Sequence, residues 1–205
     1  MLKIEHFALT PGQMRLMAID ELSVANGKKV LIYGGNEAGK TLFLKTIHGD
    51  NTKFAGTIHI QEKPVSYFRK RKNTVLLGNE MHLLPGETLW KNITLPFDKL
   101  SKQEKIKIFE MLKMVELSPK IGTKVKDLSF SACKFIELIR AVAQQPQLIL
   151  LDDFDNFFDD KKYLKAMDLC QYAVSGGASV IATAKNKIGY FDDYYLIHER
   201  KLVQV

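Results

Sequence analysis

The sequence contains no apolar run that approaches the ~20 residues of a membrane-spanning helix. Its first residues, MLKIEHFALT, lack the charged-then-apolar layout of a signal peptide, so we expect a cytoplasmic protein. Cysteine is scarce as well, because the sequence contains only Cys133 and Cys170. Neither of them forms a CxxC or CxxH pattern, so no cysteine metal site is indicated. Both fall in helix-like segments, which predicts reduced thiols in the core.

The composition is that of an ordinary globular protein, with 46% hydrophobic and 26% charged residues. The length of 205 residues suits one α/β domain with its own core. A net charge of +7 permits binding to nucleic acid, phosphates or anionic lipid without establishing any of them. The basic run RKRK, Arg69 to Lys72, lies between two strand-like segments and contains no aromatic residue, which favours a solvated connection over a nucleic-acid patch.

Strand-like and helix-like segments alternate along the chain. Strand patterns occupy residues 2–10, 15–24, 30–33, 56–60, 74–78, 148–151 and 179–183, and a hairpin pattern occupies 194–205. Helical patterns occupy residues 40–49, 101–117, 131–144 and 161–174. This order predicts an α/β fold, with a mostly parallel sheet flanked by helices.

The segment from 101 to 117 has the clearest helical signals. Ser101 and Glu104 have the spacing of a capping box. An apolar stripe is predicted to pack into the core, and it comprises Ile106, Phe109, Met111, Leu112 and Val115.

The segment GGNEAGKT, Gly34 to Thr41, matches the pattern GxxxxGK[ST] between a buried-strand pattern and a helix. Its glycines let the backbone turn tightly, so that successive N–H groups and a helix N-terminus face an anion. Lys40 would reach the β- and γ-phosphates of a nucleoside triphosphate, and Thr41 would ligate Mg²⁺. We assign the nucleotide contacts to Gly34, Gly35, Asn36, Glu37, Ala38, Gly39, Lys40, Thr41 and Leu42.

The stretch LILLDDFDNFFDD, Leu148 to Asp160, sets five aspartates after a buried-strand pattern. An EF-hand calcium loop is excluded, because Phe157 and Phe158 stand where that loop needs an acid or amide and a glycine. A phosphate-binding loop needs an aspartate at the end of a second strand to hold the metal, and Asp152 has that place. Asp155 and Asp160 are expected to be solvated.

Together these segments resemble the ATP-binding-cassette (ABC) ATPases, in the compact branch that includes the cell-division ATPase FtsE and the lipoprotein-release ATPase LolD. HLLPGETLWKNITLP, residues 82–96, is similar to the segment that follows the family's Q-loop. LSFSACKFIELIRAVAQQPQLILLDDFDNFFD, residues 128–159, is similar without a gap to its signature, helix, Walker B and D-loop run. The resemblance implies one ABC domain over residues 1–205, with a nucleotide-binding core at 1–78 and 132–205, a small antiparallel β part and a helical subdomain at 79–131.

Four elements depart from the family pattern. The signature LSGGQ reads LSFSA, so that Phe130 and Ser131 replace both glycines. The Q-loop glutamine falls on Asn79, a candidate third metal ligand. The Walker B glutamate, which polarises the attacking water, falls on Asp153. The switch histidine falls on Ala184. The aromatic residue that stacks adenine has no evident counterpart, since Pro11 lies near its expected place.

The resemblance implies ATP and Mg²⁺ as cofactors, with Lys40 and Asp153 as the catalytic candidates. Ser129, Ser131 and Asp159 stand where family members contact the opposite protomer. The implied partners are a membrane-embedded permease-like subunit and a second ABC ATPase, as homodimer or heterodimer, with attachment to the inner face of the cytoplasmic membrane. The departures leave open an alternative, a subunit that binds ATP with little hydrolysis. Action on nucleic acid is not expected.

Overall fold

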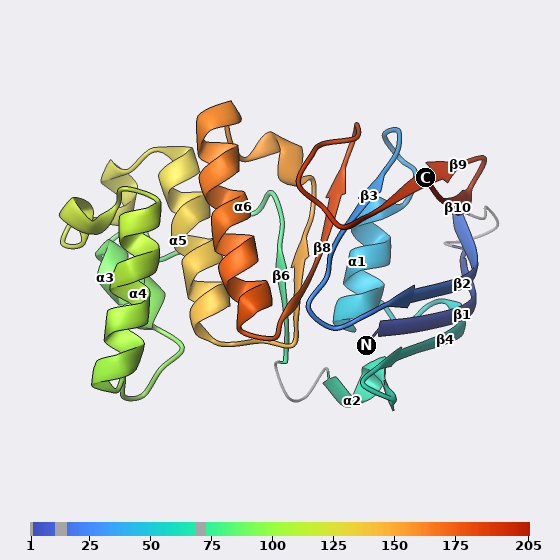
Figure 1. Ribbon diagram of the computed structural model, residues 1–205, viewed down its shortest axis with the longest axis horizontal. Coiled ribbons are helices and arrows are strands. Elements are labelled where there is room, and N and C mark those ends of the chain that lie inside the picture. The colour runs from blue at the N-terminus through green and yellow to red at the C-terminus, as the bar shows by residue number, and fades with distance from the viewer. Residues whose placement is uncertain (1, 11–15, 69–72) are drawn as a thin grey trace. The chain divides into compact units, whose positions relative to one another are not determined.

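The computed structural model describes residues 2–10, 16–68 and 73–205 (Figure 1). Residues 11–15, which include Pro11, and the basic run at 69–72 therefore lie outside the described residues. The described strands are β1 (Leu2–Leu9), β2 (Met17–Val24), β3 (Lys29–Tyr33), β4 (Ala55–Ile60), β5 (Lys63–Pro64), β6 (Thr74–Leu77), β7 (Leu148–Leu151), β8 (Ser179–Ala184), β9 (Asp193–His198) and β10 (Lys201–Gln204).

The strands form one ten-stranded sheet in the order β5-β4-β1-β2-β10-β9-β3-β8-β7-β6. Strands β6, β7, β8, β3 and β9 pair in parallel, in agreement with the predicted mostly parallel sheet. The pairs β1–β2, β1–β4, β4–β5 and β9–β10 are antiparallel, and they supply the predicted antiparallel part. The predicted C-terminal hairpin is confirmed as β9 and β10.

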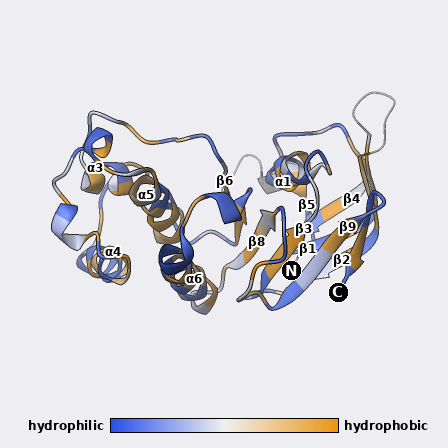
Figure 2. Cartoon of the chain, turned by 90° about the horizontal axis from the view of Figure 1, so that it is seen from above, coloured by the Kyte–Doolittle hydropathy of each residue, from blue (hydrophilic) through white to orange (hydrophobic). Residues whose placement is uncertain are grey.

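The contact pattern divides the described chain into two units, and the whole sheet belongs to the first, at residues 1–78, 146–155 and 177–205. This sheet unit also contains α1 (Lys40–His48) and α2 (Val65–Phe68). Strands β7 and β8 are buried at every position, which explains their continuous apolar runs. Phe43 of α1 packs edge-to-face on Phe7 of β1, with ring centroids 5.3 Å apart. Figure 2 shows hydrophobic residues on the strands interspersed with hydrophilic ones.

The second unit, which we call the helical unit, comprises residues 79–145 and 156–176. Its helices are α3 (Leu89–Thr94), α4 (Lys102–Met114), α5 (Phe130–Ala143) and α6 (Asp160–Ser175). The bounds of α4, α5 and α6 are close to those predicted, whereas α3 was not predicted. In Figure 2 its long helices carry both hydrophilic and hydrophobic residues. The predicted capping box is present at α4, since Ser101 and Glu104 exchange side-chain and backbone hydrogen bonds.

The predicted core stripe of α4 is only partly right. Met111, Leu112 and Val115 are buried, but Ile106 and Phe109 are 48% and 40% exposed. At 100° per residue, the buried face passes through Ile108, and Ile106 lies on the opposite side of the helix. Phe109 instead stacks on Trp90, with ring centroids 5.3 Å apart.

Both cysteines are buried thiols, as predicted. Burial raises the pKa of the Cys133 thiol, which favours the protonated form. None of the described helices is long and apolar enough to cross a membrane.

Candidate functional site

The predicted phosphate-binding loop, Gly34 to Thr41, connects β3 to α1. Gly34 N–H donates to the carbonyl of Ala184 at 3.2 Å, so the loop starts from a point fixed at the end of β8. Gly39 caps α1 with a φ of +88°, a conformation that glycine adopts without strain. A Cβ at Gly39 would lie only 3.3 Å from the Leu16 Cβ, so space as well as conformation favours glycine here.

Lys40 is buried and its ammonium group is directed back onto the loop. Its Nζ donates to the carbonyls of Gly34 and Gly35, each at 2.9 Å. The first turn of α1 contains no acidic residue that would offset the positive end of the helix dipole. The loop therefore gathers an ammonium group, a helix N-terminus and backbone N–H groups, which is the chemistry that a phosphate chain requires.

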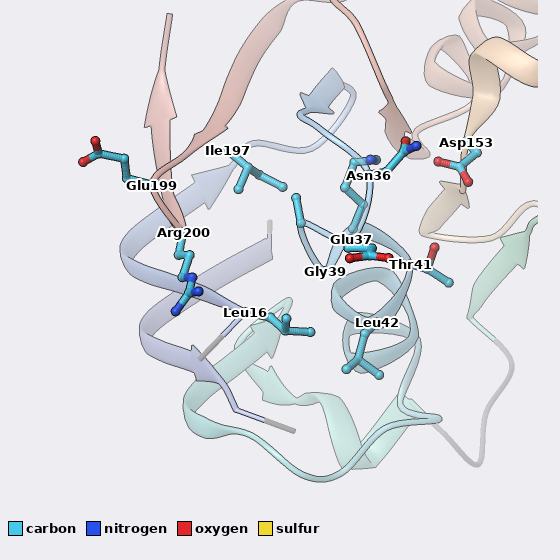
Figure 3. A pocket seen from close by; sticks show the side chains of 12 residues that line it. Leu16, Asn36, Glu37, Gly39, Thr41, Leu42, Asp153, Ile197, Glu199 and Arg200 are labelled. Atoms are coloured by element: carbon cyan, nitrogen blue, oxygen red, sulfur yellow. The ribbon is translucent and has the colours of Figure 1, made fainter. Parts of the chain in front are cut away.

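A cavity of about 730 Å³ lies over this loop (Figure 3). Residues 36–42 line it, and Asp153 from the segment after β7 contributes to the same lining. The cavity also reaches Leu16, Ile197 near the end of β9, and Glu199 and Arg200 in the β9–β10 turn. The last four are residues that the sequence patterns did not indicate, because they lie far from the motif along the chain.

Asp152 follows β7 and is buried. Its backbone N–H donates to Leu77 O at 2.7 Å, and its Oδ1 accepts from the Thr183 hydroxyl at 2.8 Å. Thr183 was not predicted as a site residue, and no local pattern distinguishes it from other buried strand residues. The Thr41 hydroxyl and the Asp152 carboxylate are hard oxygen donors of the kind that Mg²⁺ prefers, so these residues fit the expected metal.

Asp153 is held by the same threonine. Its N–H donates to Thr183 Oγ1 at 3.0 Å, so one hydroxyl both accepts from Asp153 and donates to Asp152. Asp153 has a φ of +50°, a left-handed conformation that aspartate tolerates better than most residues. The two neighbouring carboxylates have different surroundings. Asp152 accepts from the Thr183 hydroxyl, whereas Asp153 lines the cavity.

The remaining aspartates of this stretch have separate environments. Asp160 is exposed, as predicted. The prediction that Asp155 is solvated is wrong, because it is half-buried and its Oδ2 accepts from Lys185 N–H at 3.0 Å. Asp159 caps α6 by accepting from Lys162 N–H at 3.0 Å. The Lys162 side chain also donates to it, which holds the pKa of Asp159 below its usual range.

The helical unit carries the other predicted site residues. Ser129 caps α5, and its Oγ lies 3.4 Å from that of Ser131. Phe130 follows the cap and is 50% exposed. Asn79 is exposed at the start of the unit. In the sheet unit, Ala184, the predicted counterpart of the family's switch histidine, is fully buried at the end of β8.

Comparison with known proteins identifies the family. The family model described as ABC transporter matches residues 18–156, more than half of the chain. The manganese transport system ATP-binding protein MntB of Listeria innocua is 26% identical over 204 residues, covering 94% of this chain and 85% of that protein. The methionine import ATP-binding protein MetN of Clostridioides difficile is 26% identical over 168 residues, covering 78% and 52%.

Solved structures agree on the fold. CbiO1 of Clostridium perfringens, part of the ABC transporter complex cbiONQ, has a TM-score of 0.83 at 20% identity, covering 98% of this chain and 86% of that one. An ABC transporter ATP-binding protein of Pyrococcus furiosus has a TM-score of 0.83 at 20% identity, covering 97% and 98%. The predicted α/β fold of the P-loop NTPases, with its ABC-type additions, is thus confirmed. The chain belongs to the ABC transporter family, as an ATP-binding subunit.

Proposed function

We propose that this chain binds Mg-ATP on the loop from Gly34 to Thr41 and couples nucleotide binding to a membrane-embedded permease-like partner. It would act as one half of an ABC dimer at the inner face of the cytoplasmic membrane, with slow or partner-dependent hydrolysis. The relatives' names mention manganese and methionine, which do not converge on one solute, so the proposal names no transported substrate. The place within the FtsE and LolD branch stays a prediction.

The observation that carries this proposal is the state of Lys40. A lysine buried beside a helix N-terminus, with its ammonium group on the Gly34 and Gly35 carbonyls, needs an anion to balance its charge. The β- and γ-phosphates of a nucleoside triphosphate would supply that anion in the part of the cavity that the loop lines. Residues 36–42 would surround the phosphates with backbone N–H groups.

The metal and the attacking water are assigned to the two neighbouring aspartates. Thr41 and Asp152 would hold Mg²⁺, with Asn79 as a third candidate ligand, and the metal would neutralise charge on the phosphates. Asp153 would polarise the attacking water. Its carboxylate is one methylene shorter than the glutamate at this position in the family, which makes hydrolysis the weaker part of the activity.

A second candidate function is a nucleotide-binding regulatory or structural subunit that does not hydrolyse ATP, for example the degenerate half of a heterodimer. Two features of the described residues favour it. Phe130 places an exposed aromatic side chain at the signature, where Ser129, Ser131 and Asp159 would have to approach an opposite protomer closely. Ala184 offers no polar side chain at the end of β8.

Calorimetric titration with Mg-ATP and a phosphate-release assay test the proposal, each with the purified wild-type chain and a Lys40→Ala variant. We expect the wild type to bind Mg-ATP and the variant to lose most of that affinity. Turnover above that of the variant, alone or with the co-purified membrane partner, supports an ATPase. Binding without such turnover supports the regulatory subunit, and absence of binding contradicts both functions.

Replacing Asp153 with glutamate is expected to raise turnover by up to about a hundredfold, because the restored methylene brings the carboxylate within reach of the water. The measurement is the kcat for phosphate release. Asp160→Glu is the matched control, since the same substitution at an exposed site should leave kcat unchanged. If Asp153→Glu also leaves kcat unchanged, the limiting defect is at Ala184 or at the signature.

A further inference from the structure

The cavity over the phosphate-binding loop extends beyond the part that phosphates would occupy. Among the described residues that line it, none is aromatic. Outside the loop, its apolar lining comes from Leu16 and Ile197, and its guanidinium group comes from Arg200. A base attached to phosphates on this loop would therefore meet an aliphatic and cationic surface.

The two aliphatic side chains stand directly against the ends of the loop. The Leu16 Cβ lies 3.3 Å from the position that a Cβ on Gly39 would take. The Ile197 Cβ lies 3.0 Å from the corresponding position at Gly34. Both apolar side chains therefore pack against the loop itself and line the same cavity.

Arg200 is brought to this surface by the turn between β9 and β10. Glu199 and Arg200 form a two-residue turn with φ values of +45° and +64°, typical of a tight hairpin. The Arg200 carbonyl accepts from Ala18 N–H at 2.8 Å, which ties the turn to β2 close to Leu16. The Arg200 side chain is exposed and lies on the hairpin beside the cavity (Figure 3).

From this arrangement we infer that Leu16, Ile197 and Arg200 form the subsite for the adenine ring of ATP. The inference rests on the proposed binding of ATP at the loop. Leu16 and Ile197 contact the apolar edge and face of the ring, while the planar, weakly hydrated guanidinium of Arg200 stacks on its π-system. The subsite performs the stacking that aromatic side chains provide in many nucleotide sites.

An arginine near bound ATP can also act on the phosphates, and the test must separate the two roles. Tripolyphosphate carries the anionic part of ATP without the base and ribose. Arg200→Ala is expected to weaken Mg-ATP binding about tenfold, which matches the loss of one cation–π stack, and to leave Mg-tripolyphosphate binding unchanged. Arg200→Lys keeps the charge without the planar group and should also weaken Mg-ATP binding.

The control is Lys201→Ala, which removes an exposed cation from the next residue, outside the cavity lining. It should change neither affinity. Equal weakening of ATP and tripolyphosphate by Arg200→Ala would overturn the subsite and make Arg200 a phosphate ligand. Unchanged ATP affinity would overturn it too. A wild-type chain that binds tripolyphosphate and ATP equally well overturns the subsite alone, whereas one that binds neither overturns the proposed function with it.

Discussion

Replacing Lys134 with methionine is expected to destabilise the helical unit by about 3–5 kcal/mol, because it leaves the Glu137 carboxylate buried without its counter-charge. The two side chains lie one turn apart on α5, and each is 1% exposed. Their Nζ and Oε2 atoms are 2.8 Å apart. Because the Glu137 side chain is almost fully buried, water cannot solvate its charge once the lysine is removed.

The pair is also bonded to the segment that follows Asn79. Lys134 Nζ donates to Glu80 O at 3.2 Å, and Glu137 Oε1 accepts from His82 N–H at 2.6 Å. Lys134 Nζ further lies 4.8 Å from the centre of the Phe157 ring. These contacts hold the start of the helical unit against α5, so breaking the pair should loosen that segment as well as lower stability.

Urea denaturation followed by tryptophan fluorescence measures this effect locally, because the chain's single tryptophan, Trp90, belongs to the helical unit. The double variant Lys134→Met/Glu137→Leu removes both charges. It should recover most of the loss and keep a deficit of about 1 kcal/mol, since the His82 N–H loses its acceptor.

The control is a second lysine–carboxylate pair with the same spacing. Lys162 and Asp159 on α6 lie 2.6 Å apart, but their side chains are 43% and 58% exposed. Lys162→Met should therefore cost at most about 1 kcal/mol. Equal losses for the two single variants, or a double variant no more stable than Lys134→Met, would contradict the assignment of the loss to a buried charge.

The loop between β3 and α1 and the order of the longer strands and helices could be predicted because their signals are local, whereas the short β5, α2 and α3 were not predicted. Gly34, Gly39 and Lys40 lie in one short loop, so their spacing can be read directly from the sequence. Strands β7 and β8 are buried at every position, and the sequence shows this as continuous, largely apolar runs. The five aspartates 152, 153, 155, 159 and 160 show the limit of this method. Their order along the chain does not say that Asp155 bonds to Lys185 N–H, 30 residues away.

The rest of the site depends on contacts between distant segments. Thr183 acts on Asp152 and Asp153 only because β7 and β8 are neighbours in the sheet. Arg200 reaches the cavity because β10 pairs with β2. The prediction that Ile106 packs into the core is wrong for a simpler reason. Apolar residues also occur on exposed helix faces, and they were counted as part of the core stripe of α4. The spacing of apolar residues does not show which of them are covered by other parts of the chain.

Replacing Gly56 with alanine is expected to lower the free energy of unfolding of the sheet unit by about 3–5 kcal/mol, from backbone strain and overpacking combined. Gly56 lies in β4 with a φ of +88°. An added Cβ would lie 2.4 Å from His6 O and 2.5 Å from Glu5 O, distances that real Cβ atoms essentially never show. The obstacle is the backbone of β1, which cannot turn aside as a flexible side chain can.

The pairing of β1 with β4 explains this close approach. Their register shifts between Glu5 and Ala8, where His6 has a φ of +49°. The shift brings the two backbones together at Gly56, so alanine there must push β1 away or abandon the pairing. Amide hydrogen exchange of β1 and β4, together with urea denaturation followed by circular dichroism, measures the loss.

Gly27→Ala separates the two causes of this loss. Gly27 also has a positive φ, +71°, but a Cβ there would meet nothing within 4 Å. Its replacement should cost only the conformational strain, about 1–2 kcal/mol. The difference between the two variants is then the contribution of the contact with β1. If Gly56→Ala costs no more than Gly27→Ala, β1 can yield at this point and the close approach does not constrain the sheet.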